Sequence, residues 1–263
     1  MSTPVLKLFD LTGKTALVTG GSRGLGLQIA EALGEAGARL LLTSRKAGDL
    51  EEASALLKVK GIEAIWIAAD ASQPSEIDRV TADAMARLGH VDILVNNAGA
   101  AWGALAKDYP LEAWDKVMNL NIRSIFLMSQ AIGKANMIPR RQGRIVNVAS
   151  IAGLAGNSAD MQTLAYNTSK GAVVNFTRTL AGEWGKYNIN VNALAPGMFP
   201  SKMTRGTFDR IGADAVAAHA PLKRVGDDDD LKGAALLFAS AAGKHITGQI
   251  LPIDGGVSAI IAA

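Results

Sequence analysis

Cysteine is absent from this chain of 263 residues, which excludes disulfide bonds, thiolate catalysis and cysteine-ligated metal sites. Histidine occurs only at His90, His219 and His245, and this scattered spacing does not match that of a metal site. We therefore predict no bound metal. A lack of cysteine is typical of proteins kept in a reducing compartment, so we expect the protein in the cytoplasm.

Long apolar runs are also absent, because no stretch reaches the roughly 18 uninterrupted apolar residues that a membrane span needs. The segment Met1–Asp10 lacks the basic, apolar and small-residue regions of a secretory signal. We expect a soluble protein that has no membrane partner and is not secreted.

Neither sign of charge is in large excess, because 27 basic and 24 acidic residues leave a formal net charge of +3. Basic residues neither form long runs nor alternate with aromatic residues, as they do in proteins that bind single-stranded nucleic acid. We predict no nucleic-acid partner.

The run Asp227–Asp230 is the one conspicuous block of charge. It precedes a helical pattern, and carboxylates at a helix start can cap free N–H groups and interact favourably with the helix dipole. A cation site is the alternative, although consecutive acidic residues before a helix cannot wrap an ion as a calcium loop does.

Strand-like and helix-like segments alternate along the whole chain. Apolar, β-rich runs predict buried strands at Thr15–Thr19, Leu40–Thr43, Ile62–Ala68, Ile93–Val95, Ile145–Val148, Ile189–Ala193 and Gln249–Ile253. Helical spacing predicts helices that include Leu25–Gly34, Ser75–Leu88, Trp114–Ala135, Ser169–Trp184 and Leu231–Ala239. This alternation predicts an α/β fold of the doubly wound Rossmann type, with a seven-stranded parallel sheet. We find no internal repeat or linker, so we expect residues 1–263 to form a single domain.

A glycine-rich segment follows the first predicted strand and leads directly into a helix. Glycine lets the backbone turn tightly and lets a pyrophosphate approach the amides at the helix N-terminus. The candidate cofactor-binding residues here are Gly20, Ser22, Arg23, Gly24, Leu25 and Gly26. A simple glycine-rich turn is the alternative interpretation of this segment.

The second predicted strand is followed by Ser44 and Arg45 instead of the acidic residue that commonly binds the ribose of NAD. Because a guanidinium can hold a phosphate through paired bonds, Arg45 and Arg23 favour the 2′-phosphate of NADP(H). Arg45 and Lys46 could instead be solvated loop charges. Asp70, after the third strand, can accept a bond from the adenine amino group or cap the next helix.

Tyr166 and Lys170 lie four positions apart at the start of a predicted helix, so they share one face. An ammonium beside a phenol favours the phenolate, and we therefore expect the pKa of Tyr166 below its usual value of about 10. Ser150 follows the fifth strand, at the sheet edge where ligands bind in such folds. Its hydroxyl could polarise a carbonyl, although a chance pairing of Tyr and Lys on a helix is also common.

Asparagine occurs at two further places of interest. The segment Asn96–Gly99 closes the fourth strand, and Asn121 lies inside a predicted helix, where asparagine is a poor helix former. A structural role for Asn121, such as a bound water or a π-bulge, is the alternative to a functional one.

Taken together, these motifs closely resemble the classical short-chain dehydrogenase/reductase family over essentially the whole chain. The resemblance includes the glycine cradle, Asp70, Asn96–Gly99, Asn121, Ser150, the Tyr166/Lys170 pair, Pro196–Gly197 and Asp254–Gly256. Within this family, the chain is similar to members such as the 3-oxoacyl reductases and the gluconate 5-dehydrogenases.

The resemblance implies an NADP(H)-dependent enzyme of the carbonyl reductase type. Tyr166 would protonate the carbonyl oxygen, Ser150 would steady that oxygen, and Lys170 would bind the nicotinamide ribose. Asn121 would hold a water of the proton relay. Further cofactor contacts are implied at Ala71, Asn97, Ala98, Gly99, Pro196, Gly197 and Thr204.

Two segments should shape the substrate pocket. The loop Ile151–Ala165 looks longer than its counterpart in many family members and carries Asn157, Met161 and Gln162. The segment 198–220 carries Met198, Phe199, Met203 and Phe208 and is typical of a mobile lid, with a surface helix pair as the alternative. The candidate substrate-binding residues are Ser150, Met161, Gln162, Met198 and Phe199.

Apolar residues in these segments, together with Trp102, favour a 3-oxoacyl thioester of acyl carrier protein or coenzyme A. A sugar or aldonate of the gluconate type is the alternative substrate. A dinucleotide-sensing regulator and a cofactor-free binding module are the non-enzymatic alternatives. Relatives commonly assemble through the two long helices that carry Asn121 and Tyr166, so we predict a homotetramer.

Overall fold

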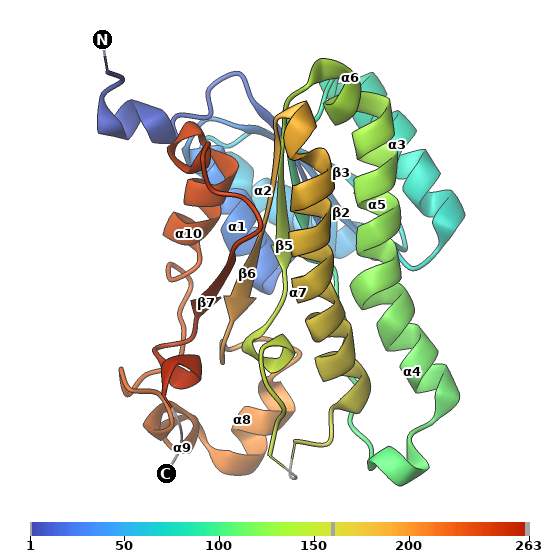
Figure 1. Ribbon diagram of the computed structural model, residues 1–263, viewed down its shortest axis with the longest axis vertical. Coiled ribbons are helices and arrows are strands. Elements are labelled where there is room, and N and C mark those ends of the chain that lie inside the picture. Colours follow the sequence, from blue (N-terminus) through green and yellow to red (C-terminus); the bar gives the residue numbers. More distant parts are fainter. Residues whose placement is uncertain (1, 159–160, 261–263) are drawn as a thin grey trace.

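A single parallel sheet of seven strands organises the chain (Figure 1). The computed structural model describes residues 2–158 and 161–260. The strands are β1 (Thr15–Thr19), β2 (Arg39–Ser44), β3 (Ala64–Ala68), β4 (Ile93–Asn96), β5 (Gly143–Val148), β6 (Ile189–Pro196) and β7 (Ile250–Ile253). Their order is β3-β2-β1-β4-β5-β6-β7, which confirms the predicted doubly wound fold.

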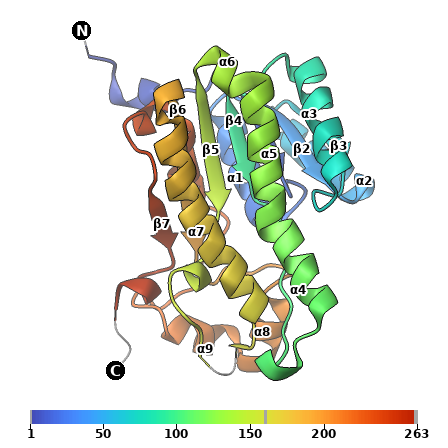
Figure 2. The same cartoon turned by 45° about the vertical axis from the view of Figure 1, so that its right-hand side comes forward.

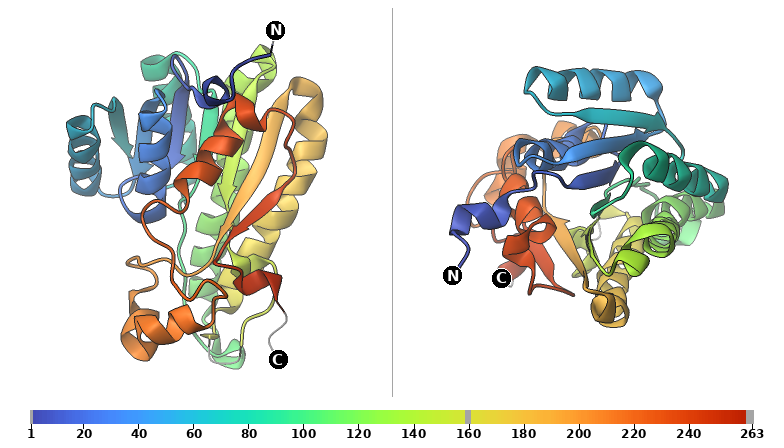
Figure 3. Two further views of the ribbon diagram at one scale, coloured as in Figure 1. Left: turned by 90° about the vertical axis from the view of Figure 1, so that its left-hand side faces the viewer. Right: turned by 90° about the horizontal axis from the view of Figure 1, so that it is seen from above.

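Helices cover both faces of this sheet (Figures 1 and 3). The main helices are α1 (Gly24–Glu35), α2 (Ala47–Val59), α3 (Pro74–Leu88), α4 (Leu111–Met118), α5 (Ser124–Ile132), α7 (Leu164–Trp184), α8 (Arg205–Ile211), α9 (Ala213–Ala218) and α10 (Lys232–Ala239). Residues of α1, α2 and α10 pack in one apolar cluster, and residues of α3, α5 and α7 pack in another. The sheet thus lies between two separate cores.

The order of the strands places the candidate site. Because β1 pairs with both β2 and β4, the chain reverses its direction of growth across the sheet at β1. Ligands of such sheets bind outside the carboxyl ends of the strands near this point. In Figure 1 these ends face α8 and α9, which fold over them.

Helix α2 was missed by the sequence analysis. Its core-facing stripe contains only Leu50, Ala53 and Leu57, while Leu56 and Val59 are exposed, so the apolar pattern is blurred. Helix α7 begins at Leu164, earlier than predicted, and this places Tyr166 inside the helix.

The long helix predicted around Trp114–Ala135 is interrupted by two π-helical turns. They are η3 (Asn119–Arg123) and η4 (Gly133–Met137), on either side of α5. Asn121 is fully buried in η3, which agrees with a π-bulge at this position. The helix runs beside α7 (Figure 2).

The acidic run Asp227–Asp230 is tied to neighbouring basic and amide side chains. Asp230 accepts a hydrogen bond from Nη2 of Arg224 at 2.6 Å, and Asp228 accepts one from Gln28 at 2.7 Å. Helix α10 begins only at Lys232 and has no side-chain cap, so the predicted capping role is wrong. Among the described residues no cluster of acidic or histidine side chains is placed to hold a metal.

No described helix is both long enough and apolar enough to cross a bilayer.

Candidate active site

The glycine cradle forms a tight turn between β1 and α1. Gly20 and Gly24 have φ angles of +65° and +53°, a backbone region that residues with a Cβ rarely adopt. A Cβ on Gly26 would lie 2.3 Å from the carbonyl oxygen of Gly20. Asn97 closes the turn, because its Nδ2 donates to the carbonyl oxygens of Thr19 and Gly20, each at 3.0 Å. The backbone is therefore left open to a ligand at the start of α1.

The end of β2 offers a polar site beside this cradle. The hydroxyl of Ser44 is buried and has no hydrogen-bond partner among the described residues. Arg45 next to it is exposed, and Arg23 of the cradle forms an ion pair of 2.9 Å with Asp49 in the first turn of α2. These groups fit a phosphate on a ribose, which would supply the acceptor that Ser44 lacks.

Asp70 lies after β3 in a turn that its own side chain stabilises. Its Oδ1 accepts from the backbone N–H of Ser72 at 3.0 Å and from the hydroxyl of Ser72 at 2.8 Å. The N-cap residue of α3 is Gln73, so Asp70 holds the turn before the helix and does not cap the helix itself. Its other carboxylate oxygen could accept a hydrogen bond from the adenine amino group, so the adenine contact stays a prediction.

Ser150 lies two residues after the end of β5, at the carboxyl edge of the sheet. Its hydroxyl oxygen accepts a 3.2 Å hydrogen bond from the N–H of Ala152, which fixes the start of a short helix, η5 (Ile151–Gly153). The same hydroxyl lies 3.5 Å from the carbonyl oxygen of Pro196, a long and weak contact. The side chain is thus held in place but can donate to a ligand.

Tyr166 and Lys170 lie on one face of α7, as their spacing predicts. Nζ of Lys170 is 5.7 Å from the centroid of the Tyr166 ring. Lys170 is buried, and its Nζ donates to the carbonyl oxygen of Val148 at 2.6 Å. The end of β5 therefore orients both Ser150 and the lysine.

Burial shifts the acidity of both groups on α7. It raises the pKa of the Tyr166 phenol, while a hydrogen bond with Ser150 lowers the pKa in part. It lowers the pKa of the Lys170 ammonium to about 8. The prediction of a lowered pKa for Tyr166 is wrong for this structure, because removing the phenolate from water raises the pKa by more than the neighbouring groups lower it.

Asn121 connects the loop after β4 to α7. Its Oδ1 accepts from the N–H of Ala100 at 2.8 Å, and its Nδ2 donates to the carbonyl oxygen of Ala100 and the hydroxyl of Ser169, each at 2.9 Å. The side-chain amide thus fixes the loop that carries Asn97–Gly99 against the helix of Tyr166. The π-helical turn η3 leaves its own backbone irregular at this point.

A cavity of about 1140 Å3 opens beside Ser150 and Tyr166. Its apolar lining includes Ala101, Ile151, Met161, Met198, Phe199, Met203, Ile211, Val216, Pro252 and Ile253. Three of the predicted substrate residues, Met161, Met198 and Phe199, line it together with Ser150. Gln162 does not; it is exposed, and its backbone carbonyl accepts from Ala104.

Residues of α8 and α9, within the segment 198–220, line this cavity. Thr204 lines it, and its hydroxyl donates to the carbonyl oxygen of Phe199 at 2.6 Å. Phe208 and Trp102, which the sequence analysis counted as apolar pocket residues, are not part of the lining. The sequence analysis also missed Arg210, although Thr207, Arg210 and Ile211 have the spacing of one helix face.

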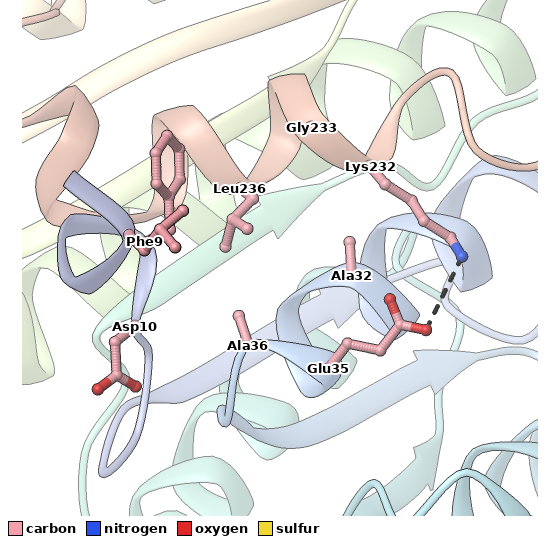
Figure 4. Close-up of a pocket in the computed structure, with 9 residues that line it drawn as sticks. Phe9, Asp10, Ala32, Glu35, Ala36, Lys232, Gly233 and Leu236 are labelled. Carbon is pink, nitrogen blue, oxygen red and sulfur yellow. Dashed lines mark ion pairs between the residues drawn. The ribbon is translucent and has the colours of Figure 1, made fainter.

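A second, smaller cavity of about 370 Å3 lies between α1, α10 and the N-terminal turn η1 (Val5–Phe9) (Figure 4). Leu236, Ala32 and Phe9 form its apolar wall. Lys232 at its rim pairs with Glu31 and, at 3.9 Å, with Glu35. None of the candidate catalytic or cofactor-binding residues lines it.

Comparison with known proteins agrees with this geometry. A family model described as short chain dehydrogenase matches residues 14–211. The chain is 40% identical over 253 residues to the rhamnolipids biosynthesis 3-oxoacyl-[acyl-carrier-protein] reductase of Pseudomonas aeruginosa, covering 94% of this chain and 97% of that protein. It is 37% identical over 253 residues to the gluconate 5-dehydrogenase of Gluconobacter oxydans, covering 95% and 97%.

A solved structure matches over nearly the same length. The gluconate 5-dehydrogenase of Burkholderia cenocepacia, crystallised with NADP and tartrate, superposes with a TM-score of 0.92 at 32% identity. The alignment covers 98% of this chain and 100% of that one. With the glycine cradle, the Ser150/Tyr166/Lys170 group and the matching sheet, these comparisons show that the chain belongs to the short-chain dehydrogenase family.

Proposed function

We propose that this protein is an NADP(H)-dependent oxidoreductase that interconverts a ketone and a secondary alcohol, with a 3-oxoacyl thioester as its ketone substrate. The observation that carries this proposal is the placement of Ser150 and Tyr166 in the wall of a largely apolar cavity. An acyl chain would bury apolar surface there. The first relative named above is a 3-oxoacyl reductase.

The protein residues would supply the proton and the orientation of the substrate. The phenol of Tyr166 donates its proton to the carbonyl oxygen, and the hydroxyl of Ser150 donates a hydrogen bond to that same oxygen. A raised pKa suits this role, because it keeps the phenol protonated at neutral pH. Lys170 holds the nicotinamide ribose, and Asn121 holds a water of the proton relay. When bound, NADPH supplies the hydride that reduces the carbonyl carbon.

The cofactor would lie along the carboxyl ends of β1, β2, β4 and β6. Gly20, Ser22, Gly24, Leu25 and Gly26 would bind the pyrophosphate, and Gly24 has open space where a Cβ would lie. Asp70 and Ala71 would bind the adenine, and the nicotinamide half would be held by Asn97, Ala98, Gly99, Pro196, Gly197 and Thr204. Ser44, Arg45 and Arg23 bind the 2′-phosphate.

Replacing Arg45 by alanine tests the 2′-phosphate site. We expect Arg45→Ala to raise the dissociation constant of NADPH about tenfold, the value of one charge-assisted hydrogen bond, and to leave that of NADH within about twofold. Quenching of tryptophan fluorescence during titration measures both constants.

Lys46→Ala is the matched control, because Lys46 is a neighbouring exposed cation. An equal rise in the dissociation constant of NADPH in both variants would mean that the overall positive charge of this loop, and not Arg45 in particular, favours NADPH. An equal loss of NADH binding in Arg45→Ala would remove the 2′-phosphate assignment.

A substrate panel tests the proposed function. We would follow NADPH oxidation with 3-oxoacyl coenzyme A thioesters of several chain lengths and with 5-keto-D-gluconate. We expect the highest kcat/KM for a thioester, rising with acyl length as more apolar surface is buried. Turnover of the keto-sugar acid alone would contradict the thioester proposal.

A sugar acid is the second candidate substrate. The cavity lining also includes the hydroxyl or amide groups of Asn157, Ser158, Thr163 and Thr207, which could bind substrate hydroxyls. Asn157 donates to the hydroxyl of Thr163 and to Oδ1 of Asn167, both at 3.1 Å. The Gluconobacter and Burkholderia relatives are gluconate dehydrogenases, and the latter crystallised with tartrate, a hydroxy acid.

We also infer that residues 1–263 form one domain, that 198–220 act as its lid and that four copies assemble in the cytoplasm. Exposed apolar side chains on the paired helices of Figure 2 support the assembly, among them Leu111, Phe126 and Leu164. Exposed apolar side chains of this size are typical of an interface.

Replacing Phe126 tests this assembly. Its side chain is 45% exposed on α5, and a carboxylate there would be buried without a partner in the tetramer. We expect Phe126→Asp to give monomers or dimers in light scattering at micromolar concentration. Leu56→Asp, at an exposed leucine of α2, should remain tetrameric. A wild-type protein that is already monomeric would contradict the proposal.

A further inference from the structure

The charged residues that line the large cavity differ in how they are paired. Arg224 is joined to Asp230 by two hydrogen bonds. Asp254 accepts from the N–H groups of Gly256 at 2.9 Å and Ser258 at 2.7 Å. Arg210 also lines the cavity, but no ion pair or side-chain hydrogen bond joins it to another described residue.

Arg210 is exposed and contributes to the lining of the cavity. Thr207, Arg210 and Ile211 lie on one face of α8, and all three line the cavity. Arg205, the first residue of the same helix, is exposed and does not line it. A guanidinium presents five N–H donors and no acceptor, so its natural partner is an anionic oxygen.

Apolar residues line the same cavity as Arg210 and the candidate catalytic groups. Ile151 and Met161 line the cavity on the side of Ser150 and Tyr166, and Phe199 and Val216 line it from the lid. The cavity therefore offers a hydrogen-bonding end for a carbonyl, an apolar wall and, at Arg210, a guanidinium that is paired with no other described residue. A ligand that matches all three is a ketone with an anionic group elsewhere in the molecule.

From this arrangement we infer that Arg210 determines substrate specificity by binding an anionic group of the ketone substrate. The inference rests on the proposed function, because it assumes that the ketone reacts at Ser150 and Tyr166. The anionic group is the phosphate of a carrier thioester or the carboxylate of a sugar acid. Both have the oxygen geometry that a guanidinium binds through two parallel hydrogen bonds.

The test compares charged and uncharged forms of the same ketone. One pair is a 3-oxoacyl coenzyme A and the matching N-acetylcysteamine thioester, which has no phosphate. The other pair is 5-keto-D-gluconate and the neutral 5-keto-D-fructose. For each protein we would measure the ratio of kcat/KM for the charged form to that for the neutral form.

We expect Arg210→Met to lower this ratio about tenfold for the pair that contains the true substrate, mainly through KM. Arg210→Lys should restore much of the ratio, because the charge returns without the paired geometry. Arg205→Met, which removes a cation from the same helix outside the cavity, should leave the ratio as in the wild type. Thermal unfolding of each variant checks that the lid still folds.

The two pairs also separate this inference from the proposed function. A ratio that falls only for the thioester pair identifies the phosphate as the ligand, and one that falls only for the keto-sugar pair identifies the carboxylate. In the second case the thioester proposal fails while the role of Arg210 stands. An unchanged ratio in Arg210→Met for every pair that the wild type turns over would overturn the inference.

Discussion

Tyr166→Phe should lower kcat for ketone reduction by about 1000-fold, because the variant keeps the ring and loses the proton donor. General acid catalysis by a positioned side chain contributes roughly 100- to 10,000-fold. Water is a poor substitute for the phenol as proton donor, because Tyr166 lies on α7 in the wall of the cavity, with Ser150 beside it. Steady-state NADPH oxidation with the best ketone of the panel measures the loss.

Tyr187→Phe is the matched control for this variant. Tyr187 lies beyond the far end of α7, packed against the core of α3 and α5, and outside the cavity. It should retain the wild-type rate. If Tyr166→Phe kept more than a third of the wild-type kcat, another group would be the proton donor.

Lys170→Met should abolish activity and stabilise the protein without ligands at the same time. We expect kcat/KM to fall about 100-fold or more, because the ammonium that orients the ribose and the phenol is lost. Burial lowers the pKa of Lys170 from 10.5 to about 8, so at neutral pH the folded chain holds a buried charge at a cost. Methionine removes this cost but leaves the carbonyl of Val148 without its donor.

The net gain in the free energy of unfolding should be about 1–2 kcal/mol at pH 7. Between pH 8 and pH 10.5 the folded lysine is neutral while the unfolded lysine remains protonated, so wild-type stability rises with pH in this window. The advantage of Lys170→Met should therefore be largest below pH 8 and shrink toward pH 10.5. Urea unfolding of both proteins across this range measures it.

Lys186→Met, at an exposed lysine, should change neither stability nor its pH dependence appreciably. A destabilised Lys170→Met at pH 7 would show that the hydrogen bond to Val148 outweighs the cost of burying the charge. A stability difference that does not depend on pH would mean that Lys170 titrates near its usual pKa.

The sequence was sufficient to predict the sheet and the residues at its edge. Buried parallel strands are continuous apolar runs, and the five inner strands fit this pattern, whereas β3 and β7 at the two edges of the sheet are only partly buried, contrary to prediction. Ser150 follows such a run directly, and the helical spacing of Tyr166 and Lys170 places them on one face. Local patterns therefore determined where these groups lie.

Properties that depend on tertiary packing could not be predicted in this way. The direction of the pKa shift of Tyr166 follows from how deeply α7 is packed, which no spacing of residues shows. The bonds of Asn121 to Ala100 and Ser169 join three distant segments. The contribution of Arg210 to the cavity lining depends on the position of α8, which no local pattern shows.

The central claim is that the cavity beside Ser150 and Tyr166 is a site of hydride transfer to a ketone. The most direct test is to incubate the wild-type protein with the best ketone of the panel and NADPH deuterated at both C4 positions of the nicotinamide, and to analyse the product by mass spectrometry. The account predicts one deuterium on the carbinol carbon for each NADPH oxidised, and essentially no product with Tyr166→Phe. Oxidation of NADPH that yields no deuterated alcohol would contradict it.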